Sequence, residues 1–536
     1  MKHIRTALSV CAGVCLCASV STASTISVAA GGDLQGAINN AQPGDTIALA
    51  RGATFTGGFV LPNKGGSTTI TIRTAGDDGL PTDGGRITPQ NAAQLARIKS
   101  NGGPAFQTQP GAHHWKLMLL EIAGVGGNDL VLLGDGSGAQ SQLSQVPHDL
   151  VVDRVYIHGD ATNGQKRGIA LNSASTTITG SYISDIKQVQ QDSQAICGWN
   201  GPGPYTITNN YLEAAGENIL FGGSDPFIKN LTPADITIAG NLVMKQTAWR
   251  TQNWSVKNLI EFKNARRVQV VGNNFAYNWQ GGQPGYAVLF TPRNQDGGCP
   301  WCQVDHINFE QNIVQHSSAG INILGADYNN PSLQTQALVI RNNLFADIDS
   351  QNWGGNGYFA QITGGPRDIT IDHNTIISDH GSGVLLLDGA MIQQFTLTNN
   401  VAKANAYGII GTSHGVGNDS IGAFLPASTI RQNVLAGGSA GSYPGGNSFP
   451  TVDQFQAQFV SYSSGDYRLT AASPWRGAGL DGLDLGAVFG AAPTSASGPA
   501  PSAAQASSTA SDSAPAPSQR HTPDSPSDIV GTATPR

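Results

Sequence analysis

The sequence predicts an all-β solenoid, in which short strands of successive coils stack into long parallel sheets. Three observations predict this fold. An asparagine recurs roughly every 30 residues between Asn210 and Asn433, which is typical of solenoids when strands fill the repeat. Short runs of alternating apolar and polar residues precede each asparagine, as in strands with one buried face. Charged residues make up only 12% of the chain while glycine supplies 68 of 536 residues, which favours strands and tight turns over helical bundles.

Each repeat places its asparagine between two strand-like segments. Runs such as Ile236-Thr237-Ile238 precede it, and a second short strand follows, as at 259–263 or 287–291. The pattern selects Asn210, Asn241, Asn274, Asn312, Asn343, Asn374, Asn400 and Asn433. Asparagine tolerates a left-handed backbone, and its amide can hydrogen-bond to the next coil. We therefore expect an asparagine ladder along a rod of about twelve coils, on the order of 55 Å long at the usual strand spacing.

The two ends of the chain differ from the repeats. Lys2 and Arg5 precede the apolar run 7–18, and small residues then lead to a predicted cleavage site after Ala23, so residues 1–23 are expected to be an export signal. That run is too short to cross a bilayer, and no later stretch is long and apolar enough. Residues 491–536 are mostly Ala, Ser, Pro and Thr and predict a disordered tail. The folded domain is therefore expected at 24–490, in a secreted or periplasmic protein.

A short helix is expected where the first coil needs a cover against edge pairing. Asp33 is the predicted N-cap, Leu34 and Ile38 lie on its apolar face, and Pro43-Gly44 ends it. At the other end, the segment 465–486 is expected to fold back as the last strands or as a C-terminal cover.

The cysteines beyond the export signal are Cys197, Cys299 and Cys302. In an oxidising compartment Cys299 and Cys302 would close a small disulfide loop and leave Cys197 reduced and buried. A redox-active pair is the alternative, but the helix start that such motifs need is not predicted here. A zinc site would need a second ligand pair, and none follows at suitable spacing.

The predicted helix, the Gly-Asp-Thr-Ile turn at 44–47 and the asparagine-centred coils together resemble the pectate lyase-like superfamily, over about residues 25–490. The resemblance implies a right-handed parallel β-helix. It implies no single activity, because the fold occurs in lyases, glycoside hydrolases, epimerases, adhesins and phage tail proteins.

The segment from Lys245 to Arg267 has an unusual charge. It holds six basic side chains and one acid, Glu261, in a chain whose formal net charge is −7. The overall charge weighs against a nucleic-acid partner, whereas such a local basic patch can attract an anionic ligand. In the strand 258–264, Ile260 and Phe262 should point inward, so Glu261 and Lys263 should point outward together.

Further polar residues should follow on this outward face. Thr291 and Arg293 lie on the next coil, and the predicted sugar contacts are Asn218, Asn322, Gln361 and Arg266. A polar column along one sheet is the kind of groove that holds an extended polysaccharide.

The order Glu261, Lys263, Asn264 and then Arg293 one coil later resembles the chondroitin- and alginate-cleaving β-helix lyases. The resemblance implies Lys263 as the base that removes the proton beside a uronate carboxylate, and Arg293 as its partner. It also implies calcium held by acidic residues, with Glu261 as an orienting residue or metal ligand. The family has an acid five positions before its lysine, where this chain has Asn258. The alternative is that Glu261 and Lys263 form an exposed surface ion pair of little energy.

Three acids in turns after strands of this sheet are candidate Ca²⁺ ligands: Asp225, Asp296 and Asp327. An aspartate at such a place can equally cap a turn. The sequence Asn-Gln-Asp-Gly at 294–297 is also similar to the acid motif of polygalacturonases, but their second acidic pair and histidine motif are missing.

Histidines and tryptophans gather around the central coils. His306, His316, His373 and His380 are expected to be turn or ladder residues on another side of the rod. The loop tryptophans Trp249, Trp254, Trp279, Trp301 and Trp353 could stack on sugar rings or cover exposed coil edges.

The sequence as a whole predicts a monomeric enzyme, a polysaccharide lyase acting on an acidic, uronate-containing polysaccharide. A non-catalytic glycan-binding or surface-attachment protein is the alternative from another class, which the tail favours as a spacer. A polygalacturonase-like hydrolase is a further alternative.

Overall fold

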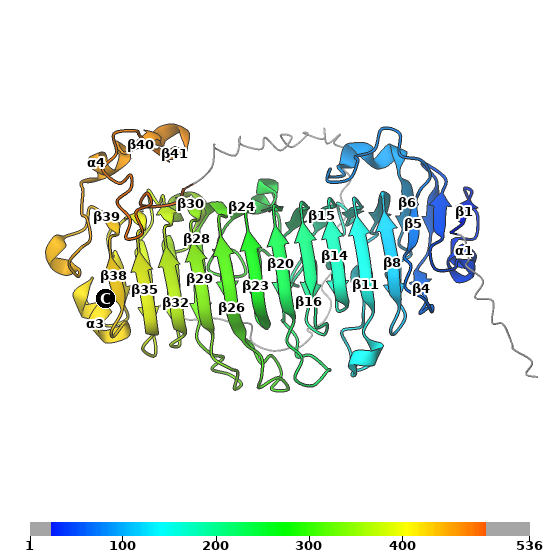
Figure 1. Cartoon of the computed structure of the whole chain (residues 1–536), viewed down its shortest axis with the longest axis horizontal. Coiled ribbons are helices and arrows are strands. Elements are labelled where there is room, and N and C mark those ends of the chain that lie inside the picture. The colour runs from blue at the N-terminus through cyan, green and yellow to red at the C-terminus, as the bar shows by residue number, and fades with distance from the viewer. Residues whose placement is uncertain (1–22, 489–536) are drawn as a thin grey trace, which may run out of the picture.

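The computed structural model, which describes residues 23–488, shows a right-handed parallel β-helix (Figure 1). Three long sheets run the length of the rod, and within each of them neighbouring strands are parallel. Each coil contributes one strand to sheet A, then one to sheet B and one to sheet C. The predicted tail 491–536 and the predicted export signal, apart from Ala23, lie outside the described residues.

Sheet A has 14 strands and crosses the front of Figure 1. They are β1 Thr25–Val28, β2 Thr46–Leu49, β5 Ile70–Thr74, β8 His113–Met118, β11 His148–Asp153, β14 Ala174–Thr179, β17 Tyr205–Thr208, β20 Ala234–Ala239, β23 Ala265–Val271, β26 Val304–Glu310, β29 Gln336–Arg341, β32 Arg367–Asp372, β35 Gln393–Thr398 and β38 Thr429–Arg431.

Sheet B has 13 strands. They are β3 Thr54–Thr56, β6 Ala96–Lys99, β9 Leu120–Ala123, β12 Tyr156–His158, β15 Tyr182–Ile186, β18 Tyr211–Ala214, β21 Leu242–Met244, β24 Asn274–Asn278, β27 Ile313–Ser317, β30 Leu344–Ile348, β33 Thr375–Ile376, β36 Val401–Lys403 and β39 Val434–Ala436.

Sheet C has 12 strands. They are β4 Phe59–Leu61, β7 Phe106–Thr108, β10 Asp129–Leu133, β13 Arg167–Leu171, β16 Gln194–Gly198, β19 Glu217–Phe221, β22 Ile260–Phe262, β25 Tyr286–Phe290, β28 Ala319–Leu324, β31 Tyr358–Thr363, β34 Gly383–Asp388 and β37 Ile409–Gly411.

The helical elements are short. The α-helices are α1 Leu34–Asn40, α2 Ser350–Trp353, α3 Asn418–Phe424 and α4 Val452–Gln456; the 3₁₀ turns are η1 Pro89–Gln94, η2 Leu143–Gln145, η3 Thr247–Thr251, η4 Ala440–Ser442 and η5 Tyr462–Ser464. Among the described residues, no helix has the length and apolar character needed to cross a membrane.

The core is one continuous apolar column inside the three sheets. On the inner side of sheet C, the rings of Phe221, Phe262 and Phe290 stack from coil to coil with centroids 6.1 Å apart. Such stacks fix the register, because a slip by one residue would turn every side chain to the other face. The residue before each ring, such as Glu261 before Phe262, therefore faces outward.

The asparagine ladder forms the corner between sheets A and B. The side-chain oxygen of Asn273 accepts hydrogen bonds from the backbone N–H and the amide of Asn241, both at 2.9 Å. Its own amide donates to Asn312 and to the carbonyl of Ile238. The ladder residue in this coil is thus Asn273, and the prediction of Asn274 was wrong. The corner needs a left-handed residue immediately before the ladder asparagine, and Gly272 fills that place with φ 66°.

Helix α1 lies near β1 at the N-terminal end of the rod (Figure 1). Asp33 is its N-cap and accepts a hydrogen bond from the backbone N–H of Gly36, while Leu34 and Ile38 are buried in the core. The sequence indicated these bounds because the capping residue and the apolar spacing are local signals.

The C-terminal segment folds back over the outer side of sheet B. Strands β40 Phe459–Ser461 and β41 Asp466–Leu469 form an antiparallel pair. Trp475 and Leu485 then pack with Val401 and Val434. The backbone N–H of Gly486 donates to the carbonyl of Asn399, so the segment follows the rod back toward earlier coils.

Candidate functional site

The bend between sheets B and C decides which side chains reach the outer face of sheet C. Two consecutive residues point into the core at the start of these strands, as Ala195 with Ile196 and Leu259 with Ile260 show. Asn218 occupies the same place one coil after Ala195 and is fully buried. Its predicted role as a sugar contact is therefore wrong. A strict alternation of inward and outward side chains predicted that Asn218 faces outward. The bend shifts this alternation by one residue, so Glu217 faces outward instead.

Glu217 lies in a buried cluster of polar side chains on this outer face. The cross-strand pairs place it in one column with Arg167 and Gln194. Gln194 donates to Glu217 Oε2 at 2.9 Å, and Lys257 Nζ lies 3.3 Å from Glu217 Oε1 and 2.6 Å from Asp192 Oδ2. Burial raises the pKa of Glu217, and the Asp192 carboxylate adds to this while Lys257 opposes it. Although burial opposes its charge, the two carboxylates raise the pKa of Lys257.

Glu261 and Lys263 lie one strand further along. Lys263 Nζ is 3.8 Å from Glu261 Oε1, and the two side chains share the outer face as the alternation predicts. Thr291 donates to Glu261 Oε1 at 3.0 Å and Asn258 donates to Glu261 Oε2 at 2.9 Å, so the carboxylate is held from both sides. The exposed fractions of the two side chains are 8% for Lys263 and 2% for Glu261. The alternative of an exposed surface pair is wrong, because both side chains are buried.

Arg293 is brought next to Lys263. Its backbone N–H donates to the Lys263 carbonyl at 3.0 Å, which reflects the stacking of the two coils. Its guanidinium pairs with Asp327 Oδ1 at 3.0 Å and lies over the ring of Tyr328. Lys263, Arg293 and Asp327 therefore lie close together. Asp327, which was predicted as a metal ligand, forms an ion pair with Arg293.

The polar column beyond Glu261 is interrupted. The residue paired with Glu261 on β25 is Leu289, which packs with Tyr286 and Ala319 on the outer face. Asn322 and Gln361 follow in register on the next two strands and are partly exposed. Their role as sugar contacts stays a prediction, and an apolar patch lies between them and the charged cluster.

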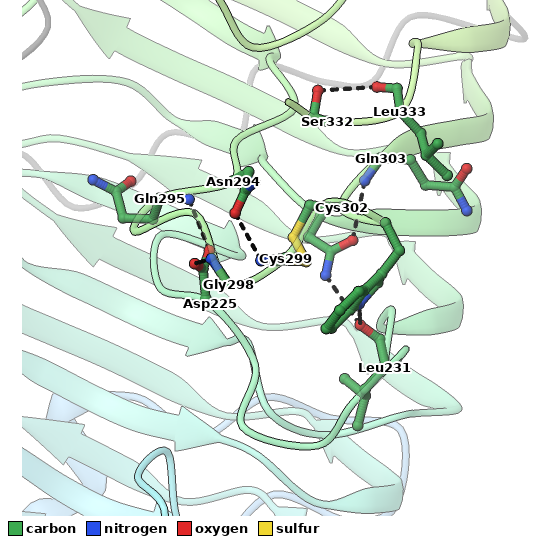
Figure 2. Close-up of a disulfide and its surroundings, with 12 residues drawn as sticks. Asp225, Leu231, Asn294, Gln295, Gly298, Cys299, Cys302, Gln303, Ser332 and Leu333 are labelled. Carbon is green, nitrogen blue, oxygen red and sulfur yellow. Dashed lines mark hydrogen bonds between the residues drawn. A yellow bond between two sulfur atoms is a disulfide. The ribbon is translucent and has the colours of Figure 1, made fainter. Parts of the chain in front are cut away.

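Two of the three predicted metal ligands, Asp225 and Asp327, accept hydrogen bonds from loop residues. Asp225 accepts hydrogen bonds from the backbone N–H groups of Gln295, Asp296 and Gly298, as Figure 2 shows in part. Its carboxylate also lies near the sulfur atoms of Cys299 and Cys302, but these form a disulfide.

Asp327 likewise accepts from the backbone N–H of Asn294 and from Arg293. Asp225 and Asp327 thus fix the disulfide loop, which corresponds to the turn-capping alternative. The Asp296 side chain is exposed. Cys197 is a buried free thiol whose pKa burial raises to about 12.

Arg266 is not part of this face. It belongs to sheet A, where it pairs in register with Ala234, and it lines a cavity of about 360 Å³ with Arg267 and Asp235. The prediction of Arg266 as a contact in the sheet C groove was wrong, because the chain turns from sheet C to sheet A at Asn264.

Lys245 lies inside the bend behind this cluster. Its exposed fraction is 1%, and its ammonium donates to five oxygens at 2.6 to 3.1 Å, those of Ala214, Ala215, Gly216, Asn218 and Asn258. Burial lowers the pKa of Lys245 to about 7, although Glu217 acts to raise it. Lys245 thereby ties the backbone beside Glu217 to the backbone of Asn258.

Four of the five loop tryptophans gather at the same bend. Trp301 lies apart from them, in the disulfide loop, where its ring N–H donates to the Leu231 carbonyl. Trp249 and Trp279 are buried, and the ammonium of Lys187 lies over the rings of Trp249 and Trp254. His316 stacks on Tyr277 and pairs with Asp347. The tryptophans therefore cover the coil edge, while Trp254 and Trp353 stay partly exposed.

Five residues of this face were not predicted from the sequence, namely Glu217, Lys257, Asp192, Gln194 and Arg167. A signal existed for Glu217, since a carboxylate directly precedes the strand that was assigned to the groove. Lys257 and Asp192 come from loops of different coils, and their approach depends on loop paths that no periodicity records.

Comparison with known proteins finds similar solved structures at low sequence identity. No protein-family model matches this chain, and no curated protein sequence matches it. The PL6 family alginate lyase AlyGC aligns with a TM-score of 0.49 and 13% identity, over 78% of this chain and 53% of that chain. The chain thus spans about half the length of that enzyme.

Two further solved structures show the same kind of similarity. A mannuronic acid specific polysaccharide family 6 lyase from human gut microbiota aligns with a TM-score of 0.41 and 11% identity, over 81% of this chain and 93% of that one. An exopolygalacturonase from Thermotoga maritima aligns with a TM-score of 0.36 and 12% identity, over 65% and 82%. All three identities are 13% or lower.

Proposed function

We propose that the protein is a polysaccharide lyase that cleaves a uronate-containing polysaccharide by β-elimination on the outer face of sheet C. The observation that carries the proposal is the adjacency of Lys263, Glu261 and Arg293 on neighbouring coils of that face. Lys257 and Arg167 bring two more cations to this face, and each of them is paired with carboxylates.

The chemistry needs a base and stabilisation of negative charge. Lys263 Nζ accepts the C5 proton of a uronate, a double bond forms between C4 and C5, and the C4–O bond to the leaving sugar breaks. The released oxygen takes up a proton from solvent, and the protonated Lys263 afterwards returns its proton to solvent. Glu261, held by Thr291 and Asn258, orients the lysine. Charge that develops on the uronate carboxylate is stabilised by the cationic side chains around it.

The resemblance to β-helix lyases also implies calcium. Two buried amide oxygens of this cluster, Gln194 Oε1 and Asn258 Oδ1, accept no hydrogen bond within residues 23–488, and Glu217 Oε1 has the Lys257 ammonium 3.3 Å away as an ion-pair partner. Oxygen donors of this kind fit Ca²⁺, so these residues would hold the ion. When bound, it would neutralise the uronate carboxylate. They differ from the aspartates that the sequence suggested.

Hydrolysis is the second candidate, and one observation favours it. The raised pKa of Glu217 beside Asp192 suits a general acid in a pair of carboxyl groups. Hydrolysis yields new reducing ends without the unsaturated uronate that β-elimination leaves. The two reactions therefore differ in one measurable product.

The test is incubation with alginate, pectate and glycosaminoglycans, following ultraviolet absorbance of unsaturated uronates together with reducing ends. Lyase activity gives both signals, hydrolysis gives reducing ends alone, and binding without either indicates a glycan-binding protein. Lys263→Ala should then lower kcat by at least ~10², the usual cost of losing a general base.

Two further variants separate chemistry from folding. Lys263→Arg keeps the positive charge but cannot accept a proton, because a guanidinium stays protonated, so it should fold and remain inactive. Lys116→Ala removes an ion-paired lysine of sheet A and should keep full activity. An active Lys263→Arg enzyme would contradict the assignment of Lys263.

A further inference from the structure

On the sheet C face, the arginine of β13 is held by a carboxylate and by an aromatic ring. Arg167 Nη1 lies 3.1 Å from Asp129 Oδ1, and Arg167 Cζ lies over the ring of Trp199, 5.0 Å from its centroid. The ring N–H of Trp199 donates to the carbonyl of Gly136 at 2.9 Å. The ring is therefore fixed in place, and it is partly exposed.

The same arrangement recurs further along this face. Arg293 Nη1 lies 3.0 Å from Asp327 Oδ1, and Arg293 Cζ lies over the ring of Tyr328, 5.3 Å from its centroid. The Tyr328 side chain is 61% exposed, so its ring presents an apolar surface to a ligand. We call the Arg167–Trp199 pair the first anchor and the Arg293–Tyr328 pair the second anchor.

Lys263 lies midway between the two anchors. The cross-strand pairs place Trp199, Gly222 and Lys263 at the same position of three successive coils. An added Cβ at Gly222 would lie 2.7 Å from the Lys263 Cβ, so this position has to stay without a side chain, and the surface between Trp199 and Lys263 is low. In the sheet order, Trp199 follows β16, two steps before β22, and Tyr328 follows β28, two steps after it.

We propose that the two anchors bind one chain of a uronate-containing polysaccharide, which runs along the rod and crosses Lys263. Four strand steps separate β16 from β28, or about 19 Å at ~4.8 Å per step. An extended polysaccharide advances by roughly one sugar unit over such a step, so the anchors recognise a segment of about four units.

Each part of an anchor has its own role in this recognition. The aromatic ring stacks on the apolar face of a sugar ring. The arginine already has an aspartate partner, so it contributes oriented N–H donors for carboxylates and hydroxyls instead of net charge. The inference rests on the proposed function and adds to it that cleavage occurs inside the chain, with sugar units bound on both sides of Lys263.

The test is isothermal titration calorimetry with oligosaccharides of two and of six mannuronate or galacturonate units. Lys263→Arg is the background, because the proposed cleavage is absent there. Only the hexasaccharide reaches both anchors at once, so it should bind at least about tenfold more tightly than the disaccharide. Trp199→Ala and Tyr328→Ala should each weaken hexasaccharide binding about three- to tenfold and change disaccharide binding by no more than about twofold. A structural defect alone would weaken the binding of both ligands alike.

The chain offers a matched control in Trp353. Arg250 Cζ lies 4.9 Å from its ring centroid, but Trp353 ends α2, at the bend between sheets B and C. Trp353→Ala should bind the hexasaccharide as the background does. Trp199→Phe keeps an aromatic ring and should retain most of the affinity, and circular dichroism of each variant shows whether the fold is retained.

Three results would each overturn the two-anchor site. They are equal or absent binding of the two oligosaccharides, an anchor variant that binds the hexasaccharide like the background, and equal losses in Trp353→Ala and Trp199→Ala. Anchor-dependent binding without cleavage by the wild type would support the two-anchor site and overturn the proposed lyase activity, so the two failures are distinguishable.

Discussion

The corner between sheets A and B and the corner between sheets B and C are built in opposite ways. At the first, one left-handed residue and one buried asparagine recur in coil after coil, as in Gly240-Asn241 and Gly272-Asn273. At the second, the connection varies from a short link between β18 and β19 to a long loop between β21 and β22. The regular corner holds the rod together, whereas the irregular corner carries the charged side chains.

This difference shows how one fold separates stability from chemistry. The ladder asparagines satisfy their hydrogen bonds with one another, so each coil supports the next and none of them faces a ligand. The loops at the second corner are free to differ in length and sequence, and such loops are where binding residues collect on rigid scaffolds. The following substitutions test that division.

The largest effect is expected at the regular corner. Asn273→Ala would leave the backbone N–H of Asn241 without a partner and would remove the amide donor of the Ile238 carbonyl. The Asn241 amide would lose one of its two acceptors and keep the Ile207 carbonyl. At ~1 to 3 kcal/mol for each buried unsatisfied group, we expect the free energy of unfolding to fall by about 4 kcal/mol. Guanidinium chloride denaturation measures this change.

Asn274→Ala is the matched control at the next position. Its side chain lies outside the ladder, where its oxygen accepts a 3.3 Å hydrogen bond from Gln315. The expected loss is below about 1 kcal/mol. If Asn274→Ala cost as much as Asn273→Ala, the ladder assignment would be wrong.

The next effect concerns the buried ammonium at the irregular corner. Lys245→Met would leave four backbone carbonyls and Asn218 without their donor, and removing one partner of a buried charged network costs about 3 kcal/mol. In the double variant Lys245→Met with Asn218→Leu, apolar packing should recover part of that loss.

The effect of Lys245 should also depend on pH. Its native-state pKa of about 7 lies below its unfolded value near 10.5, so between these pH values the unfolded chain binds the extra proton. The unfolding free energy of the wild type should therefore rise with pH in this window, by at most ~1.4 kcal/mol per unit. The unfolding free energy of Lys245→Met should not show this rise with pH. A difference between the two proteins that stays constant from pH 7 to pH 10 would show that the five oxygens keep the ammonium charged.

The two corners also explain what the sequence could predict. The solenoid, the helix at Leu34 to Asn40 and most of the ladder follow from local signals that repeat, namely a capping aspartate, alternation and a spaced asparagine. Asn273 was missed by one residue because Gly272 and not a first asparagine takes the left-handed position in that coil.

The candidate site was predicted only where alternation continues undisturbed. Glu261 and Lys263 follow the strand directly, and Arg293 follows the equivalent strand of the next coil. Asn218 was misplaced because two inward residues follow one another at the bend. Lys257 lies in a long loop that brings it to Glu217. The path of such a loop cannot be predicted from a repeating sequence pattern.

A smaller effect is expected for the lysine that neutralises two carboxylates at the irregular corner. Lys257→Met leaves Glu217 buried without its cation. Because the lysine is partly exposed, we expect a loss of about 2 kcal/mol at pH 7, below the full cost of breaking a buried pair. The loss should shrink as the pH falls, since Glu217, with its raised pKa, takes up a proton.

Lys116→Met is the matched variant on a regular strand. Lys116 pairs with Asp153, which Arg154 also holds, so the carboxylate keeps a cation when the lysine is lost. We expect less than about 1 kcal/mol. Thermal unfolding of both variants at pH 5 and pH 7 measures the contrast, and equal losses at the two sites would argue against a special role for the sheet C cluster.

The smallest effect is expected where the sequence and the structure disagree about the groove. Arg266 lies on sheet A, so Arg266→Ala should leave kcat/KM for a cleaved polysaccharide unchanged within about twofold. Gln361 lies on the outer face of sheet C in register with Asn322, so Gln361→Ala should raise KM several-fold with little change in kcat, as loss of a binding contact does. Steady-state kinetics on the same substrate compare the two variants. A larger rise in KM for Arg266→Ala than for Gln361→Ala would place the bound chain across the turn from sheet C to sheet A, and would return Arg266 to the substrate-binding face.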